Sequence, residues 1–548
     1  MDHEWVGGGD VADTDDLFDA FRDGLVSRRD FIKRSLLMGA SLATVQGYLA
    51  EHARGSIRAL AETPRRGGTL TAVFSADPAG LDPVRGPSGM SHVVMEQVYS
   101  TLMSLTPDNK VYPDLAESYQ VSSDGLTYTF KLRKGVTFHN GDPLTAEDVK
   151  FTFDRLRAPH SGYSYGSQVA TIKRVVVIDP HTVAFHLSEK TAPFLIYMAF
   201  PGSSIVPKKL VQSGHDLNKQ PIGSGAFKFV SYQPKNSISF ARHANYYQRG
   251  KPYLDAMTWR IIADTSALTT ALVTGEAQFT NVVPPQNWKQ VKSTHGLATA
   301  AVQGSSYNWL LPNNSKSPFT NEKVRQAISY ALNRQDLVNG AFFGLATPIL
   351  GGVIPSWSWA YAPDVRFTGP TGDPAKAKRL LAQAGYANGF STKMTIASSF
   401  PNLMAMAPII QQDLAKVGIK AKIGTVEIPR YWDVVWSTSN FDITTMYWVS
   451  PLVDPDDFLF NNYHSKMPIN VQKYSSPRMD KLLEEAKATA SQGRRKQLYR
   501  EIQELSMHDM PIVPLVNGSL LFAYTEKLRG FQPTRTGLVK NLRDAWLS

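Results

Sequence analysis

One short stretch, residues 126–133, alternates strictly between apolar and polar side chains. Its apolar members are Leu126, Tyr128, Phe130 and Leu132. Because successive side chains of a strand point to opposite faces, this order predicts a strand with one buried face. Lys134 and Gly135 favour a turn into a second apolar run at 136–138, which Asn140-Gly141-Asp142 closes, a pattern typical of a hairpin.

A different period, with apolar residues three and four positions apart, predicts helices. Thr145, with Asp148 three residues later, is a capping pair that begins one of them. From residue 320 onward this period dominates, and Asp373 and Gly385 mark the start and the end of another helix. The first helix of that part carries Val324, Ala327, Ile328, Ala331 and Leu332 on one face.

Helical and strand-like segments alternate in the second half of the chain, which indicates an α/β fold. Strands are predicted at 419–423 and 441–448, and an earlier one at 69–74. The chain has 548 residues, more than one hydrophobic core ordinarily serves, so at least two lobes are expected. No fixed repeat and no long linker separates them, so the lobes are expected to be interwoven.

Composition excludes several classes of site. The chain has no cysteine, which excludes disulfides, thiolate metal sites and a cysteine-borne lipid anchor. Its formal charge of +11 is spread along the sequence, which gives nucleic-acid binding no support. Residues 1–61 carry three more acidic than basic residues, so their removal would leave +14 and would slightly favour anionic ligands.

The amino-terminal part has the order of an export signal. Arg28 and Arg29 precede a short apolar run at 36–43, and the small-residue pattern Ala59-Leu60-Ala61 follows. The paired arginines resemble a twin-arginine signal, so residues 1–61 are predicted to be cleaved after passage through the twin-arginine translocon. The alternative is a basic amphipathic helix packed on the body. The apolar run is too short to span a bilayer, and no later apolar stretch reaches the length of about 20 residues that a span needs, so the mature protein is expected to be periplasmic and soluble.

The ordered set of motifs resembles the peptide/nickel-type (family 5) solute-binding proteins of ATP-driven ABC importers. The matching segments are 115–119, 122–139, 148–149, 151–155, 221–227, 324–328, 373–386 and the Asp454-Pro455 pair after Trp448. This resemblance implies a two-lobed, periplasmic-binding-protein-like (type II, cluster C) clamshell that closes on a solute. It also implies a monomer whose partners are ABC permease subunits with their ATPases.

The resemblance further implies a division of the chain. Lobe I would comprise residues 62–108, 221–300 and 509–548, with an extra subdomain at 109–220. Lobe II would comprise residues 301–508.

By the same resemblance, aromatic side chains and a few polar groups would line the cleft between the lobes. The candidate ligand-binding residues are Trp448, Tyr447, Tyr307, Trp309, Trp357, Trp359, Ser88, Gly89 and Asp454. For each aromatic residue the alternative is ordinary core packing.

One departure from the family pattern bears on the ligand. Members that bind a free peptide amino terminus carry an Asp between the tryptophan and the Asp-Pro pair, but residues 449–453 contain no carboxylate. Asp454, Asp456 or Asp457 are the possible substitutes, although such a run is also typical of a helix cap. A peptide therefore competes with an oligosaccharide or an amino-acid conjugate as the ligand.

Two other functions compete with solute transport. The chain lacks a phosphate-binding loop, a His-Glu-x-x-His pair and a Gly-x-Ser-x-Gly elbow, so we expect no enzyme, no cofactor and no metal site. His139 and His464 are isolated histidines, for which exposure or local hydrogen bonding is the expected role. A hydrolase of the same ligands, or an exported chaperone or sensor without an importer, stays open as an alternative.

Overall fold

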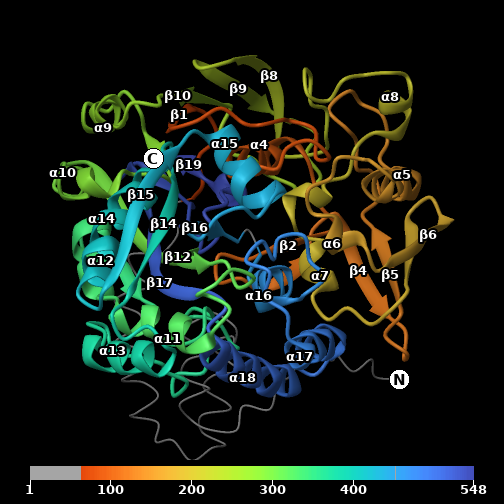
Figure 1. Ribbon diagram of the computed structural model, residues 1–548. Coiled ribbons are helices and arrows are strands. Elements are labelled where there is room, and N and C mark those ends of the chain that lie inside the picture. Colours follow the sequence, from red (N-terminus) through yellow and green to blue (C-terminus); the bar gives the residue numbers. More distant parts are fainter. Residues whose placement is uncertain (1–62, 451) are drawn as a thin grey trace, which may run out of the picture. The chain divides into compact units, whose positions relative to one another are not determined.

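The computed structural model describes residues 63–450 and 452–548 (Figure 1). The predicted export signal, with Arg28 and Arg29, lies outside the described residues. Among those residues, no helix is both long and apolar enough to cross a bilayer.

A large mixed sheet runs through residues 66–548. Its strands, in spatial order, are β15 (Ile419–Val426), β14 (Phe390–Ala397), β16 (Ile443–Val449), β12 (Leu297–Pro312), β17 (Val513–Thr525), β11 (Phe279–Thr280), β1 (Thr69–Phe74), β10 (Ala256–Ile261), β9 (Ser237–Arg242) and β8 (Phe227–Gln233), and β13 (Ala346–Pro348) also pairs with β17. The predicted strand at 69–74 is confirmed. The other two predicted strands of this sheet are confirmed with shifted ends, as β15 and β16.

Two long strands occupy the middle of this sheet. β12 has 16 residues and β17 has 13, and they pair antiparallel from Leu297↔Thr525 to Leu310↔Val513. The register shifts between Gln303 and Ser306, where β12 bulges. β12 reaches β16 on its other side, so this pair joins the β14–β16 part of the sheet to the β1–β10 part.

A second sheet has four strands and a core of its own, seen together with α5 (Ala146–Arg157) in Figure 1. Its order is β4 (Ala116–Val121), β5 (Thr127–Leu132), β7 (Thr182–Leu187) and β6 (Ile172–Asp179). The Phe185 ring packs edge-on against Phe130 at 5.5 Å and against Phe153 of α5 at 4.8 Å. The sheet falls within the predicted subdomain at 109–220, whose boundaries stay a prediction.

The alternating stretch forms β5, as predicted, and Thr145 with Asp148 forms the predicted capping box of α5. The predicted turn at 140–142 closes a short hairpin: the backbone N–H of Phe138 donates to the carbonyl of Asp142 at 2.8 Å, and Thr137 makes an antiparallel bridge to Pro143. The run does not pair with β5, because both edges of β5 are taken by β4 and β7. Its apolar residues Val136 and Phe138 are buried in the core instead.

The remaining elements connect and cover these sheets. The helices are α4 (Gly89–Val98), α6 (Gly166–Val169), α7 (Phe194–Tyr197), α8 (Lys208–Gln212), α9 (Thr265–Val273), α10 (Trp288–Lys292), α11 (Glu322–Ala331), α12 (Arg334–Phe342), α13 (Pro374–Gln383), α14 (Pro401–Ala415), α15 (Ile428–Tyr431), α16 (Pro455–Tyr463), α17 (Pro477–Ala488) and α18 (Gln492–Asp509). The short strands β2 (Met103–Leu105) and β3 (Val111–Pro113) pair with each other, as do β18 (Leu528–Arg529) and β19 (Trp546–Leu547). The predicted helices at 324–332 and 373–385 are α11 and α13, which end one or two residues earlier.

A buried ion cluster ties the carboxy-terminal segment to the start of the second sheet. Asp114 is fully buried and contacts Lys540 at 2.7 Å and Arg543 at 3.3 Å, and it accepts hydrogen bonds from Tyr247 and Gln248. Burial alone would raise the pKa of Asp114, but the two cations hold it at about 2.

We expect Asp114→Asn to lower the free energy of unfolding by about 3 kcal/mol or more at pH 7, because two cations would stay buried without their anion. Urea denaturation measures this loss. Because the folded pKa of Asp114 is depressed, its contribution is present above about pH 4 and is lost as the pH falls toward 2. The gap between wild type and variant should narrow over that range. Asp255→Asn, in a half-exposed pair with Arg242, is the control, and an equal loss there would contradict the prediction.

Candidate functional site

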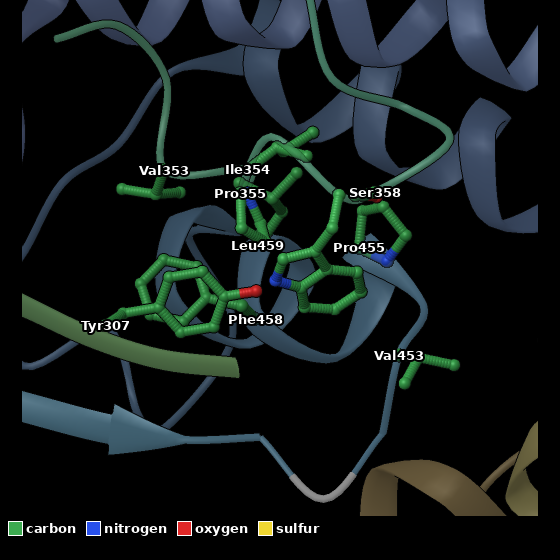
Figure 2. Close-up of a pocket in the computed structure, with 10 residues that line it drawn as sticks. Tyr307, Val353, Ile354, Pro355, Ser358, Val453, Pro455, Phe458 and Leu459 are labelled. Atoms are coloured by element: carbon green, nitrogen blue, oxygen red, sulfur yellow. The ribbon is translucent and has the colours of Figure 1, made fainter. Parts of the chain in front are cut away.

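A pocket with mainly apolar walls lies where three separate segments meet (Figure 2). The residues that line it are Tyr307, Val353, Ile354, Pro355, Trp357, Ser358, Val453, Pro455, Phe458 and Leu459. Its walls almost touch, because the open space is about 10 Å³, roughly the room that one water molecule needs. A ligand larger than that can enter only if the walls move apart.

Helix α16 forms one wall because its first turn is firmly held. Asp454 is the N-cap, and its side chain accepts a hydrogen bond from the backbone N–H of Asp456 at 3.0 Å. Pro455 at the first helical position suits this start. The turn presents Phe458, whose ring lies against Tyr307 at 4.8 Å (Figure 2) and against Trp309 at 5.0 Å.

The same turn buries three carboxylates, and each has different partners. Asp454 makes a bidentate ion pair with Arg495 at 2.6 and 2.9 Å. Asp456 accepts a hydrogen bond from the Tyr197 hydroxyl at 2.7 Å. Asp457 accepts one from the Ser450 hydroxyl at 2.6 Å. Among the described residues, only Asp454 of the three forms an ion pair, whereas Asp456 and Asp457 accept hydrogen bonds from neutral hydroxyls.

The surroundings of Asp457 make its negative charge costly. Burial raises its pKa to about 6, although the hydrogen bond from Ser450 acts in the opposite direction. The negative charge of Asp457 also acts on two tyrosine hydroxyls. Burial is the main cause that raises the pKa of Tyr307 and of Tyr165, and the charge of Asp457 raises both further. Tyr307 belongs to β12, whereas Tyr165 precedes α6. Asp457 therefore lies near residues from two distant parts of the chain.

Tyr165 connects this region to the amino-terminal part of the fold. Its hydroxyl donates to the carbonyl of Pro87 at 2.8 Å, next to Ser88, which caps α4. Its ring packs against His92 of α4 at 5.5 Å, and burial lowers the pKa of His92 to about 3. His92 is therefore neutral near pH 7 and supplies no positive charge here.

Trp357 joins the pocket to the bulge of β12. Its indole N–H donates to the carbonyl of Gly304 at 3.3 Å. The guanidinium of Arg535 lies over its ring, 5.5 Å from the centroid.

The structure brings together some of the predicted site residues. Tyr307 and Trp357 line the pocket, and half-buried Trp448 lies opposite Tyr307 in the β12–β16 pair. Ser88 and Gly89 lie beside the Tyr165 contact, and Gly89 is exposed. For all five residues, ligand binding stays a prediction.

Other predicted site residues lie elsewhere. Tyr447 is exposed and packs against Phe400 at 5.1 Å. Trp359 packs against Tyr499 at 5.7 Å, beside the Arg495 guanidinium. Trp309 is only 1 % exposed and packs in the core, which favours the alternative of ordinary packing.

Asp454 also has a structural role here, because Arg495 and the helix start occupy its oxygens. Sequence reasoning missed Tyr165, His92 and Arg535. The only signal for Asp457 was its place in the acidic run after Trp448.

The two histidines singled out in the sequence have local partners. His139 contacts the carbonyl of Gly225 at 3.0 Å, and burial lowers its pKa to about 3. His464 contacts Glu484 at 3.1 Å. Neither belongs to a group of metal-ligating residues in the described part of the chain. The group there whose spacing would suit a metal is Glu322, His508 and Asp509.

Comparison with known proteins identifies the family. Residues 110–468 match the model for bacterial extracellular solute-binding proteins, family 5. The chain belongs to this family.

Its relatives include the glutathione-binding protein GsiB of Salmonella typhimurium, 32% identical over 468 residues that cover 82% of this chain and 89% of that protein. The GsiB of Escherichia coli K12 is 31% identical over the same length, with the same coverage.

Solved structures of the family agree with the fold. The periplasmic binding protein DppA from Helicobacter pylori, in complex with the peptide STSA, is 30% identical with a TM-score of 0.78, and the match covers 88% of this chain and 98% of that one. AgaA from A. tumefaciens, in complex with agropinic acid, is 28% identical with a TM-score of 0.78, over 88% and 99%. The predicted family and the two-lobed α/β fold class are confirmed, whereas the extra subdomain stays a prediction.

We expect Asp457→Asn to raise the free energy of unfolding by about 2–3 kcal/mol above pH 7, since the folded protein then buries no uncompensated charge. Because the folded pKa of Asp457 is raised, the wild type loses stability as the pH rises from about 4 to above 6. The advantage of the variant should therefore vanish near pH 4. Urea denaturation at several pH values measures it, with exposed Asp433→Asn as the control. A constant difference across the pH range would contradict this account.

Proposed function

We propose that this protein captures a peptide or peptide-like solute outside the cytoplasm and delivers it to the permease of an ABC importer. The pocket between β12, the 353–358 loop and α16 is the observation that carries the proposal. Membership of the solute-binding family supports it, as do relatives named for binding glutathione, a peptide or agropinic acid.

Opening and closing of two lobes would perform this function without covalent chemistry. Sites for small ligands ordinarily enclose about 300–1,000 Å³, whereas this pocket has about 10 Å³. The described contacts thus correspond to closed walls, including the Tyr197–Asp456 hydrogen bond between α7 and α16. A ligand that replaces the wall contacts would shift the population between open and closed forms, and the permease would bind one of these forms.

The charges of the pocket favour one class of ligand. Asp457 lies buried beside it without an ion pair, so a cationic group of the solute would supply the missing counter-charge. An ammonium group of a peptide or of an amino-acid conjugate meets this requirement, and an uncharged oligosaccharide does not. The absence of a carboxylate at 449–453 is then compensated from the first turn of α16.

The remaining parts of the proposal concern export and chemistry. We propose that Arg28 and Arg29 direct the folded protein through the twin-arginine translocon and that the mature chain works in the periplasm without a lipid anchor. We also propose that it is a carrier and not an enzyme, because the relatives are named as binding proteins.

A thermal-shift screen of residues 62–548 tests the function. The probes are glutathione, Met-Leu, Ser-Thr-Ser-Ala and agropinic acid, with an N-acetylated form of each peptide. A bound probe at 100 times its Kd should stabilise the protein by about 2.7 kcal/mol. If no probe shifts the melting temperature, or if a probe is chemically converted, the proposal fails.

Calorimetry with the best probe then tests the pocket. We expect Trp448→Ala to weaken binding about tenfold or more, because it removes the aromatic side chain that β16 places opposite Tyr307 of the pocket. Half-buried Trp288, which packs in a separate core cluster, supplies the matched control. Trp288→Ala should lower stability and leave the affinity within about twofold, which corresponds to a few tenths of a kcal/mol. Equal losses of affinity in the two variants would contradict a role for Trp448.

A further inference from the structure

Arg535 has a guanidinium whose hydrogen-bonding capacity is mostly unused. Its Nη1 donates to the carbonyl of Gln303 at 3.1 Å, and its charge lies over the Trp357 ring. A guanidinium offers five N–H donors, and Arg535 forms no ion pair within residues 63–450 and 452–548. By contrast, Arg495 and Arg155 each hold a carboxylate with two hydrogen bonds.

The position of Arg535 is unusual because it lies at the bulge of β12. The backbone N–H of Ser305 donates to the carbonyl of Arg535 at 2.9 Å. The Arg535 guanidinium donates to the carbonyl of Gln303, and the Trp357 indole donates to the carbonyl of Gly304. Gly304 is required there, because a Cβ would come within 2.6 Å of Leu520 and 3.0 Å of the Arg535 carbonyl. The carboxy-terminal segment, through Arg535, and the pocket loop, through Trp357, thus both hydrogen-bond to the bulge of β12.

The bulge also leads to the acidic turn. The carbonyl of Ser305 accepts a hydrogen bond from the N–H of Ser450, and the Ser450 side chain bonds to Asp457. Residues 303–305 therefore link Arg535, a cation without a carboxylate partner, to Asp457, a carboxylate without a cationic partner. These two groups flank the pocket and do not neutralise each other by contact.

We propose that Arg535 receives an anionic group of the solute, such as a carboxylate, at the edge of the pocket formed by Trp357. This inference rests on the proposed function. A planar guanidinium binds a carboxylate through two parallel N–H donors, and the cation–π contact with Trp357 keeps this guanidinium beside the pocket. Since the same guanidinium bonds to Gln303, the solute would also contact the bulge of β12.

Calorimetry with pairs of probes tests the assignment. Each peptide probe, Met-Leu and Ser-Thr-Ser-Ala, is compared with its carboxy-terminal amide, and glutathione with its diamide. The wild type should bind the free carboxylate about tenfold or more tightly than the amide, as expected for a hydrogen-bonded charge pair. This comparison needs no variant, so it does not depend on the folding of one.

Two variants locate the effect. Arg535→Gln should weaken binding of the free carboxylate about tenfold and leave the amide within about twofold, and Arg535→Lys should retain part of the preference. The matched control is Arg366→Gln, an exposed arginine that also donates to a backbone carbonyl, and it should change neither affinity.

Each result decides between a binding and a structural role. Equal weakening of both probes by Arg535→Gln would show that the residue only positions Trp357 or the bulge, and would overturn the inference. So would a wild type that binds amide and free carboxylate alike, or a variant that retains the full preference. Binding of none of the probes would instead refute the proposed function itself, and the inference with it.

Discussion

The pairing of β12 with β17 is the constraint on which the rest of the structure depends. This antiparallel pair carries the connections of the large sheet in both directions, toward β16 and toward β1. Tyr307 lies on β12, and α16 follows β16, the other neighbour of β12. The walls of this pocket move when β12 or β16 bends. The register shift at 303–306 therefore lies where small changes in β12 have the largest effect on the pocket.

The acidic turn of α16 shows how three equal side chains acquire different roles. Arg495 pairs with Asp454, Asp456 bonds to the Tyr197 hydroxyl and feels the charge of Lys487, and Asp457 bonds to the Ser450 hydroxyl with no cation acting on it. Leaving a charge buried without a counter-ion lowers stability, and such residues persist mainly where function requires them. The rise of the Asp457 pKa to about 6, caused first by burial, reflects that cost.

Local patterns in the sequence predicted the elements but not the contacts between them. Alternation identified β5, and the Thr145–Asp148 capping pair identified the start of α5, because both depend on neighbouring residues only. The 140–142 turn also forms locally, but whether the run at 136–138 joins β5 depends on β7, about 50 residues later, which occupies that edge of β5. Trp309 and Tyr307 could not be ranked for the same reason, since the depth of a side chain depends on what covers it.

The charged residues of the site illustrate the same limit more sharply. The run Asp454-Pro455-Asp456-Asp457 was recognised as a helix cap and as a possible substitute for the missing carboxylate, and sequence alone could not choose among its members. Arg495, 41 positions away, takes Asp454, while Tyr197 bonds to Asp456 and Ser450 to Asp457. Likewise, Arg535 is one of 58 basic residues until the fold puts Trp357 beneath it.

These two unneutralised charges explain why a nearly closed pocket can still serve a ligand. Aromatic walls that touch each other satisfy their own apolar surface, so the empty site gains little by staying open. Apolar contacts alone would then give a solute only a small advantage over the closed walls. Asp457 and Arg535 cannot be satisfied by that closure, because no partner with a formal charge lies against either within the described chain. A solute with complementary groups therefore gains energy that the empty closed form lacks, and this difference is what shifts a population toward the bound state.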